Sequence, residues 1–169
     1  SDLYTNPICE KGYEYLNRKL NGLTRGSLSE FVFKSNDLIK TGFTDYCSAF
    51  FSDDRMVLDL SNNNYIYSIN ESVVIIRIFP ESISGKASYN YENLSKARFE
   101  FYLYLLKKYY YYLNKSNKIK VIDFLIGYGL KFNKFTYLGV LNLYLKGLLI
   151  FDFDFFKKIN KKIILSLKK

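Results

Sequence analysis

The chain of 169 residues has no histidine and no tryptophan, and it has only two prolines, two cysteines and one methionine. Without histidine the commonest general base at neutral pH is missing, so an enzyme would depend on carboxylates, lysine, tyrosine or a bound cofactor. Two cysteines without histidine cannot supply the four ligands of a structural zinc site. The sequence therefore predicts no catalytic residue, no cofactor and no metal site.

Low proline and glycine contents also exclude a fibrous or linker-dominated protein, and 49% of the residues are apolar, which is enough to build a packed core. The length fits one domain, or one domain with a helical extension. Nothing in the sequence is typical of a secreted protein. We therefore expect Cys9 and Cys47 to be reduced thiols, with a disulfide between them as the alternative.

Positive charge is concentrated in one half of the chain. Residues 1–85 carry 8 cations and 11 carboxylates, whereas residues 86–169 carry 17 cations and 5 carboxylates. Sixteen of those 17 cations are lysines, and they alternate with aromatic residues, as in Lys107–Tyr112 (KKYYYY). Lysines neutralise phosphates and aromatic rings offer stacking surfaces, so this pattern predicts a polyanion, above all RNA, as the partner.

Lysine outnumbers arginine 20 to 5, and the other abundant residues also use codons rich in A and T. This usage is typical of an organelle genome, and we expect a mitochondrial protein of the matrix or the matrix side of the inner membrane. Mutational bias explains the preference for lysine over arginine. It does not explain the excess of cations over acids, because AT-rich codons encode asparagine as readily as lysine.

We predict an α+β fold in which a strand-rich, acidic N-terminal domain (residues 1–85) precedes a lysine- and aromatic-rich helical extension (residues 86–169). Short β-branched and alternating segments separated by asparagine-rich turns predict the N-terminal strands. The expected strands are 56–60, 65–69 and 73–79, with weaker alternation over 11–19 before a turn at Asn21 and Gly22.

Helical spacing of apolar residues and the absence of proline predict helices in the second half. A polar break at 115–120 and the glycines Gly127 and Gly129 are expected to limit the second of these helices. The expected helices are 92–113, about 121 to 129, 134–150 and 155–167.

The lysines of these helices are the candidate binding residues. Lys157 and Lys161 share one helix face, as do Lys158 and Lys162, and like charges at this spacing repel unless a polyanion lies nearby. A plain solvated face is the alternative interpretation. The predicted RNA-binding residues of the second half are Lys107, Lys108, Lys115, Lys118, Lys120, Lys131, Lys134, Lys157, Lys158, Lys161 and Lys162.

The apolar segment Phe135–Phe153 is nearly long enough to span a bilayer, but it contains Lys146 near its centre, which is costly in hydrocarbon. We expect a buried helix within an assembly. A membrane-bound segment is the alternative, and in that case Lys146 would be paired or would reach the interface.

The segment from Arg18 to Arg25 (RKLNGLTR) resembles the [GR]-L-[NG]-G-x-x-R turn of small-subunit ribosomal protein three, and Val74–Phe79 (VIIRIF) resembles the apolar strand that follows it in that family. The resemblance covers about 60–70 residues of the first half. Arg18 replaces a glycine of the motif, and the family's KH domain has no counterpart here. The resemblance implies an α+β carboxy-terminal domain in which Arg18, Lys19 and Arg25 contact RNA.

Together these features predict a structural protein of a divergent mitochondrial ribosome, whose lysine-rich helices lie on rRNA phosphates while the acidic half packs on neighbouring ribosomal proteins. On this hypothesis the chain acts in translation, in the small subunit, as part of a large hetero-complex and without catalysis. The alternative is an accessory subunit of an organelle respiratory or ATP-synthase complex, bound to membrane through the same lysines.

Overall fold

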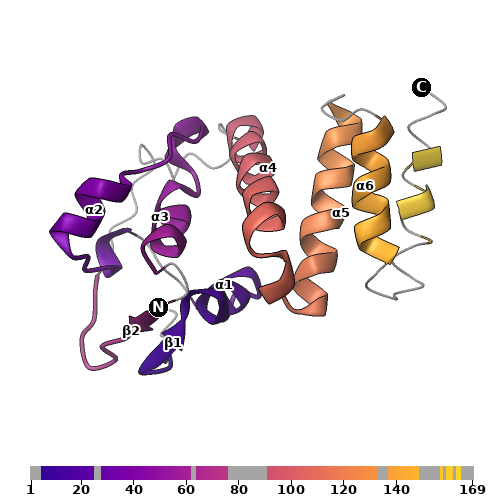
Figure 1. Ribbon diagram of the computed structural model, residues 1–169. Helices are drawn as coiled ribbons and strands as arrows, with labels where there is room; N and C mark the ends of the chain where they lie inside the picture. Colours follow the sequence, from indigo (N-terminus) through magenta and orange to yellow (C-terminus); the bar gives the residue numbers. More distant parts are fainter. Residues whose placement is uncertain are drawn as a thin grey trace. The chain divides into compact units, whose positions relative to one another are not determined.

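The computed structural model describes residues 5–24, 28–61, 64–75, 91–132 and 137–148, together with 157, 159–161 and 163–164. Most of these residues are helical (Figure 1). The helices are α1 (Gly12–Leu20), α2 (Ser35–Thr41), α3 (Ser52–Ser61), α4 (Tyr91–Lys108), α5 (Lys115–Lys131) and α6 (Tyr137–Leu148), with short 3-10 turns η1 (Leu28–Glu30), η2 (Cys47–Ala49) and η3 (Tyr110–Tyr112).

The chain divides into two compact units, Ser1–Phe101 (unit 1) and Tyr102–Lys169 (unit 2). The division falls within α4, so that the first eleven residues of this helix belong to unit 1 and the rest to unit 2. The boundary expected at residue 85 from the change in charge lies in 76–90, outside the described residues.

In the described part of the chain, the strands are β1 (Cys9–Lys11) and β2 (Tyr65–Tyr67), which pair antiparallel with Lys11 opposite Tyr65. The ammonium of Lys11 lies 3.8 Å from the centre of the Tyr65 ring. The strand expected at 65–69 is therefore present in its first three residues. A mixed α+β composition holds, but the prediction of a strand-rich N-terminal half is wrong, because helices form most of its described part.

The segment 56–60, predicted as a strand, lies inside helix α3. Met56, Val57 and Leu58 are all buried in this helix, so the apolar run that suggested a strand is the buried part of a helix in a small core. Asp53 and Asp54 occupy its first turn, where carboxylates favour the positive end of the helix dipole. A short apolar run is compatible with either a strand or a helix, and here the carboxylates in the first turn favour the helix.

Two other segments that were predicted as strands also have a different structure. The segment 11–19 lies mostly in α1, and the turn expected after it is present at Asn21 and Gly22, where glycine has a φ of 69°. The carboxylate of Glu14 accepts a 2.7 Å hydrogen bond from the backbone N–H of Lys11, which fixes the start of α1. Of the segment 73–79, residues 73–75 are exposed and irregular, and 76–79 lie outside the described residues.

The core of unit 1 is built from α1, α3 and the first part of α4. Tyr15 and Leu16 of α1 are buried, and so is Met56 of α3. The Phe101 ring of α4 stacks on Phe51 with the ring centres 5.2 Å apart and 12° between their planes. Helix α1 approaches α3 closely because Gly12 has no side chain at the point where Ser61 lies.

Unit 2 is helical in its described residues, in agreement with the prediction for the second half. Helix α4 ends at Lys108, earlier than expected, and η3 follows it. Helix α5 starts at Lys115, six residues before the expected start, and continues through Gly127 and Gly129. The expected polar break at 115–120 is thus the beginning of α5, where Lys115 and Lys120 are exposed.

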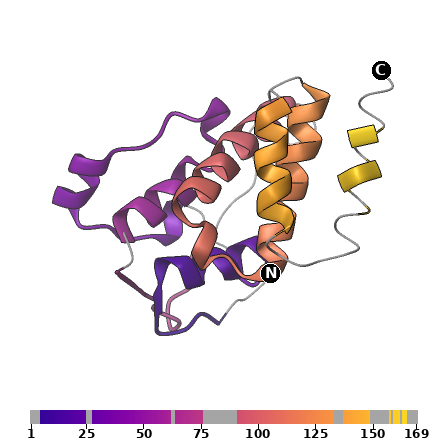
Figure 2. The same ribbon diagram turned by 45° about the vertical axis from the view of Figure 1, so that its right-hand side comes forward.

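Helices α5 and α6 lie side by side in both ribbon views (Figures 1 and 2). Helix α5 contributes five of the twelve buried apolar residues of unit 2 in the described part of the chain. The ring of Tyr102 in α4 meets Phe124 of α5 edge to face, with the ring centres 5.3 Å apart. The buried apolar residues here are Leu105, Leu106, Tyr109, Tyr110, Leu113, Val121, Ile122, Leu125, Ile126, Tyr128, Leu143 and Ile159.

Candidate nucleic-acid interface

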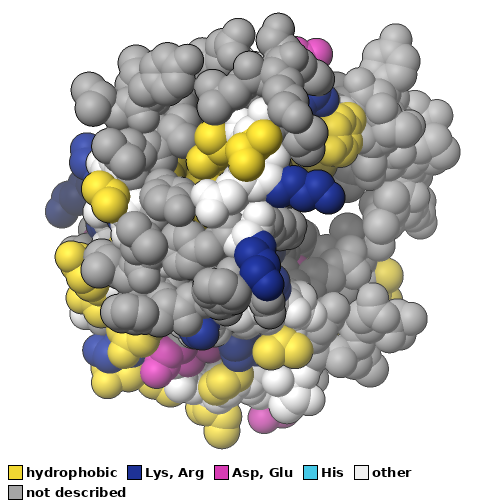
Figure 3. Space-filling model, turned by 90° about the vertical axis from the view of Figure 1, so that its right-hand side faces the viewer, with side chains coloured by type: hydrophobic (Ala, Val, Ile, Leu, Met, Phe, Trp, Pro, Cys, Tyr) yellow, Lys and Arg dark blue, Asp and Glu magenta, His cyan; other side chains and the backbone are white. Residues whose placement is uncertain are grey.

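The two units differ sharply in charge. Unit 2 carries 14 lysines and 3 carboxylates, a net charge of +11, whereas unit 1 carries 11 cations and 13 carboxylates, a net charge of −2. In the described range 102–132 there are six lysines and a single carboxylate, Asp123. Figure 3 shows lysine and arginine side chains standing out beside hydrophobic ones on one face of the molecule. The charge that the sequence places in the second half therefore belongs to unit 2 itself.

The densest group of these lysines surrounds the connection between α4 and α5, which we call the basic turn (residues 107–120). Two backbone hydrogen bonds build this connection, because the N–H groups of Tyr112 and Leu113 both donate to the carbonyl of Tyr109, at 2.9 and 3.1 Å. The side chain of Asn114 caps α5 by accepting a 2.9 Å hydrogen bond from the N–H of Asn117. The turn thus places the last lysines of α4 and the first lysines of α5 in one short, ordered segment.

The four tyrosines of the basic turn point in different directions. Tyr109 is 2% exposed and Tyr110 is 9% exposed, so both belong to the core. Tyr111 is 90% exposed and Tyr112 is 45% exposed. The run therefore anchors the turn through Tyr109 and Tyr110 and leaves Tyr111 and Tyr112 on its surface.

Tyr110 is the centre of a cationic contact. The ammonium of Lys118 lies 4.8 Å from the centre of its ring, and that of Lys146 lies 5.1 Å from it. The Tyr110 hydroxyl donates a 2.9 Å hydrogen bond to the backbone carbonyl of Lys146. Burial, and to a lesser degree the neighbouring Tyr111, raise the pKa of Tyr110. Two like charges share one neutral aromatic ring, an arrangement that an anion bound nearby would stabilise.

Other predicted lysines of unit 2 are exposed where the structure describes them. Lys108 lies 5.7 Å from the ring centres of both Tyr104 and Tyr109, and Lys131 lies 5.1 Å from that of Phe132. The predicted residues that are exposed are Lys107, Lys108, Lys115, Lys120, Lys131, Lys157 and Lys161, and Lys118 is half-buried. Lys134, Lys158 and Lys162 lie outside the described residues.

The start of α5 is electrostatically unusual, because its first turn contains Lys115 and Lys118 and no carboxylate. The amino end of a helix carries a partial positive charge, so lysines there are disfavoured unless a negative group is close. The amino end of α5 and its lysines thus carry charge of the same sign.

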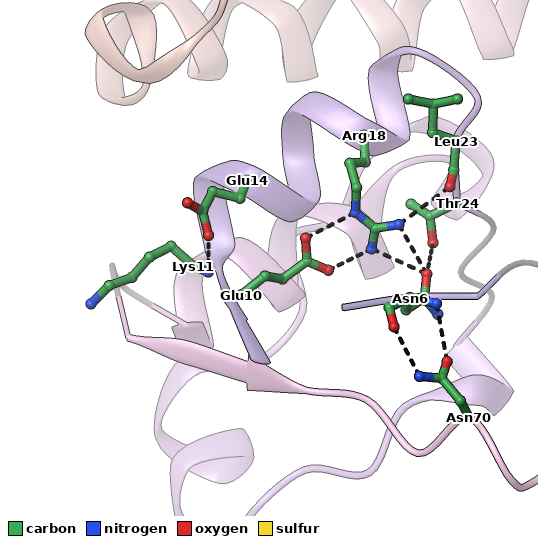
Figure 4. Close-up of polar contacts among 8 residues, drawn as sticks. All are labelled: Asn6, Glu10, Lys11, Glu14, Arg18, Leu23, Thr24 and Asn70. Atoms are coloured by element: carbon green, nitrogen blue, oxygen red, sulfur yellow. Dashed lines mark hydrogen bonds and ion pairs between the residues drawn. The ribbon is translucent and has the colours of Figure 1, made fainter. Parts of the chain in front are cut away.

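The predicted residues of unit 1 have different surroundings. Arg18 directs its guanidinium at Glu10, with N–O distances of 2.9 and 2.5 Å, and also donates to the Asn6 side chain and to the carbonyl of Leu23 (Figure 4). These contacts use all five donors of the guanidinium. Glu10 is buried, so this is an internal ion pair, and we do not include Arg18 in the interface.

Lys19 forms an ion pair with Asp54 at 3.0 Å and joins α1 to α3. Burial is the main reason that the pKa of Asp54 is raised, although Lys19 opposes the shift. Arg25 lies outside the described residues. The structure therefore brings together the lysines of the basic turn, and it gives Arg18 and Lys19 partners inside unit 1.

Lys146 is not among the residues predicted to bind RNA, because its place in an apolar segment relates it to a membrane. No sequence pattern connects Lys146 to Tyr110, because the contact depends on how α6 packs against the turn. Within the described residues, no helix is long and apolar enough to cross a membrane. Cys9 and Cys47 are both free, as expected.

Comparison of the chain with protein-family models, with curated proteins and with solved structures gives no match.

Proposed function

We propose that this chain is a structural, non-catalytic component of a ribonucleoprotein, a divergent mitochondrial ribosome, and that unit 2 binds rRNA phosphates through its lysines. The observation that carries the proposal is the basic turn. It gathers five lysines, two exposed tyrosines and a helix amino end without a carboxylate in one ordered segment. Such a surface neutralises phosphates with little reading of base sequence.

We also propose that unit 1 packs on neighbouring ribosomal proteins. It exposes large apolar side chains although its net charge is slightly negative, and exposed apolar surface of this kind is typical of protein interfaces. The most exposed of these residues are Ile8, Val32, Ile39, Tyr67, Ile69 and Ile75.

The first experiment measures the binding of the full chain to a fluorescent RNA by anisotropy over a series of salt concentrations. The double variant Lys107→Gln/Lys115→Gln is compared with the matched control Lys34→Gln/Lys40→Gln, whose lysines are exposed in unit 1. Each lost phosphate contact reduces the slope of log K against log salt by about 0.7 for a single strand. We expect the first variant to lose affinity and slope and the control to keep both. If the two variants had the same RNA affinity and the same salt slope, the basic turn would not be the RNA-binding surface.

The second experiment tests the assembly. The tagged protein in a native mitochondrial lysate is sedimented with and without RNase. Co-migration with a ribosomal subunit that is lost on RNase treatment supports the proposal. Co-migration with a detergent-solubilised membrane complex that RNase does not affect favours the alternative of a respiratory or ATP-synthase subunit.

A further inference from the structure

We propose that Tyr111 is a stacking platform for an unpaired base, so that the basic turn takes single-stranded RNA in preference to duplex RNA. This inference rests on the proposed function and specifies its ligand. It starts from the contrast between Tyr110, which is 9% exposed, and Tyr111, which is 90% exposed. An aromatic ring that could have joined the core is instead presented to the surroundings in the middle of a lysine cluster.

The exposed ring has a rigid support. The backbone of the turn is closed on both sides of Tyr111 by the hydrogen bonds that Tyr112 and Leu113 donate to Tyr109. The Tyr111 ring meets the ring of Tyr110 edge to face, with centres 5.4 Å apart and 78° between the planes. Tyr110 is itself fixed by its hydrogen bond to the Lys146 carbonyl. A ring held in this way loses little freedom when a base stacks on it.

Positive charge lies on both sides of this ring. Lys108 ends α4 three residues before Tyr111, and Lys115 begins α5 four residues after it. The Lys118 ammonium, 4.8 Å from the Tyr110 ring, is within about 10 Å of the Tyr111 ring centre when the two distances are added. A single strand presents a base between two phosphates, and this surface offers a ring between cations.

The ring also explains why a duplex is a poorer ligand. In an A-form RNA helix, both faces of each internal base are covered by the neighbouring bases. The major groove of that helix is too narrow for side chains to enter. Tyr111 can stack only on a base that is unpaired or splayed out. Duplex RNA would still meet the lysines through its phosphates, so its binding would be weaker and independent of Tyr111.

The test compares Tyr111→Ala, Tyr111→Phe and Tyr91→Ala in the full chain. Tyr91 is 70% exposed at the start of α4 in unit 1 and is the matched control. Affinities are measured by anisotropy at one salt concentration for a single-stranded RNA of about 12 nucleotides and for a duplex of the same length.

We expect Tyr111→Ala to raise the single-strand Kd by about 5- to 150-fold, the range found for lost base–aromatic stacking. Tyr111→Phe keeps the ring and should stay near the wild-type Kd, as should Tyr91→Ala. The duplex Kd should be nearly the same for all four proteins. An equal loss on duplex and single strand, or no loss for Tyr111→Ala, would overturn the stacking role while leaving phosphate binding in place. If wild type bound neither RNA at low salt, the proposed function itself would be wrong.

Discussion

The Tyr110 hydroxyl donates a 2.9 Å hydrogen bond to the backbone carbonyl of Lys146, and the Lys146 ammonium lies 5.1 Å from the centre of the same ring. One residue of α6 thus meets Tyr110 through both its backbone and its side chain. Because Tyr110 lies between α4 and α5, this pair connects α6 to the turn that joins those two helices.

Replacing Tyr110 by Phe removes the hydrogen bond and keeps the ring. We expect the free energy of unfolding to fall by about 1 kcal/mol, since the carbonyl of Lys146 then loses its partner. Urea unfolding followed by circular dichroism measures the change. The control is Tyr111→Phe, which removes a hydroxyl from a residue that is 90% exposed and should leave stability unchanged. Equal effects of the two variants would contradict the assigned hydrogen bond.

The same variant should alter the dependence of stability on alkaline pH. Burial, followed by Tyr111, raises the pKa of Tyr110 above its ordinary value of 10.0. A group with a raised pKa in the folded state contributes stability that is present below its unfolded pKa and is lost as pH rises through its folded pKa. The difference in unfolding free energy between wild type and Tyr110→Phe should therefore be constant near neutral pH and shrink above about pH 10. A constant difference throughout would show that Tyr110 does not titrate differently on folding.

Gly12→Ala should weaken the contact between α1 and α3. A Cβ at position 12 would lie 2.9 Å from the Cβ of Ser61 and still closer to its hydroxyl oxygen, which donates a hydrogen bond to the Leu58 carbonyl. We expect a loss of about 1–3 kcal/mol, typical of an overpacked core, by urea unfolding. Adding Ser61→Gly removes both colliding atoms and should restore part of the stability. Failure of this rescue would mean that the helices do not meet at these residues.

Arg18→Ala should be strongly destabilising, by about 3–5 kcal/mol, because it leaves the buried Glu10 carboxylate without its partner. Arg55→Ala is the comparison. Arg55 pairs with Asp59 at 3.1 Å in a more exposed place, where an ion pair is worth less than about 1 kcal/mol, and it also donates a 2.9 Å hydrogen bond to the Tyr46 hydroxyl, so we expect a smaller loss than for Arg18→Ala. The two variants are compared by thermal unfolding.

The conservative variant Arg18→Lys tests whether this arginine also binds RNA. It keeps the charge but loses the fork that fits Glu10 and Asn6. We expect lower stability but, at a temperature where the variant is folded, an unchanged slope of RNA affinity against salt. A reduced slope would return Arg18 to the interface.

Asn114 allows stability and binding to be separated. Asn114→Ala removes the cap of α5 and should cost about 1 kcal/mol. Asn114→Asp keeps a capping oxygen and adds a negative charge at the positive end of the helix, so it should retain stability. The same charge lies beside Lys115 and should lower RNA affinity. If both variants changed RNA affinity equally, the cap rather than the local charge would control binding.

The helices of the second half were predictable because long segments without proline have a clear helical spacing, and α4, α5 and α6 all occur. The first and last residues of these helices were harder to predict. Helix α5 begins at Lys115 because Asn114 caps it, and the polar stretch that suggested a break is the start of this helix, in which Lys115 and Lys120 are exposed and Asn117 is buried. Gly129 is buried inside this helix, where packing against neighbours outweighs the cost of glycine.

Most of the strand predictions for the first half were wrong for a related reason. The five residues 56–60, taken alone, fit a buried strand as well as a buried helix. The helix is favoured only when the preceding Asp53 and Asp54 are considered with them. Of the candidate site, the lysines of the basic turn could be predicted from charge. The role of Lys146 and the internal pairing of Arg18 could not, since both depend on contacts between distant segments.

The unequal charges of the two units have a consequence for how the protein approaches its partner. If the partner is RNA, as proposed, its phosphates attract unit 2, with a net charge of +11, and weakly repel unit 1, with −2. We therefore expect encounters to start at unit 2, and association to be faster at low salt than at high salt.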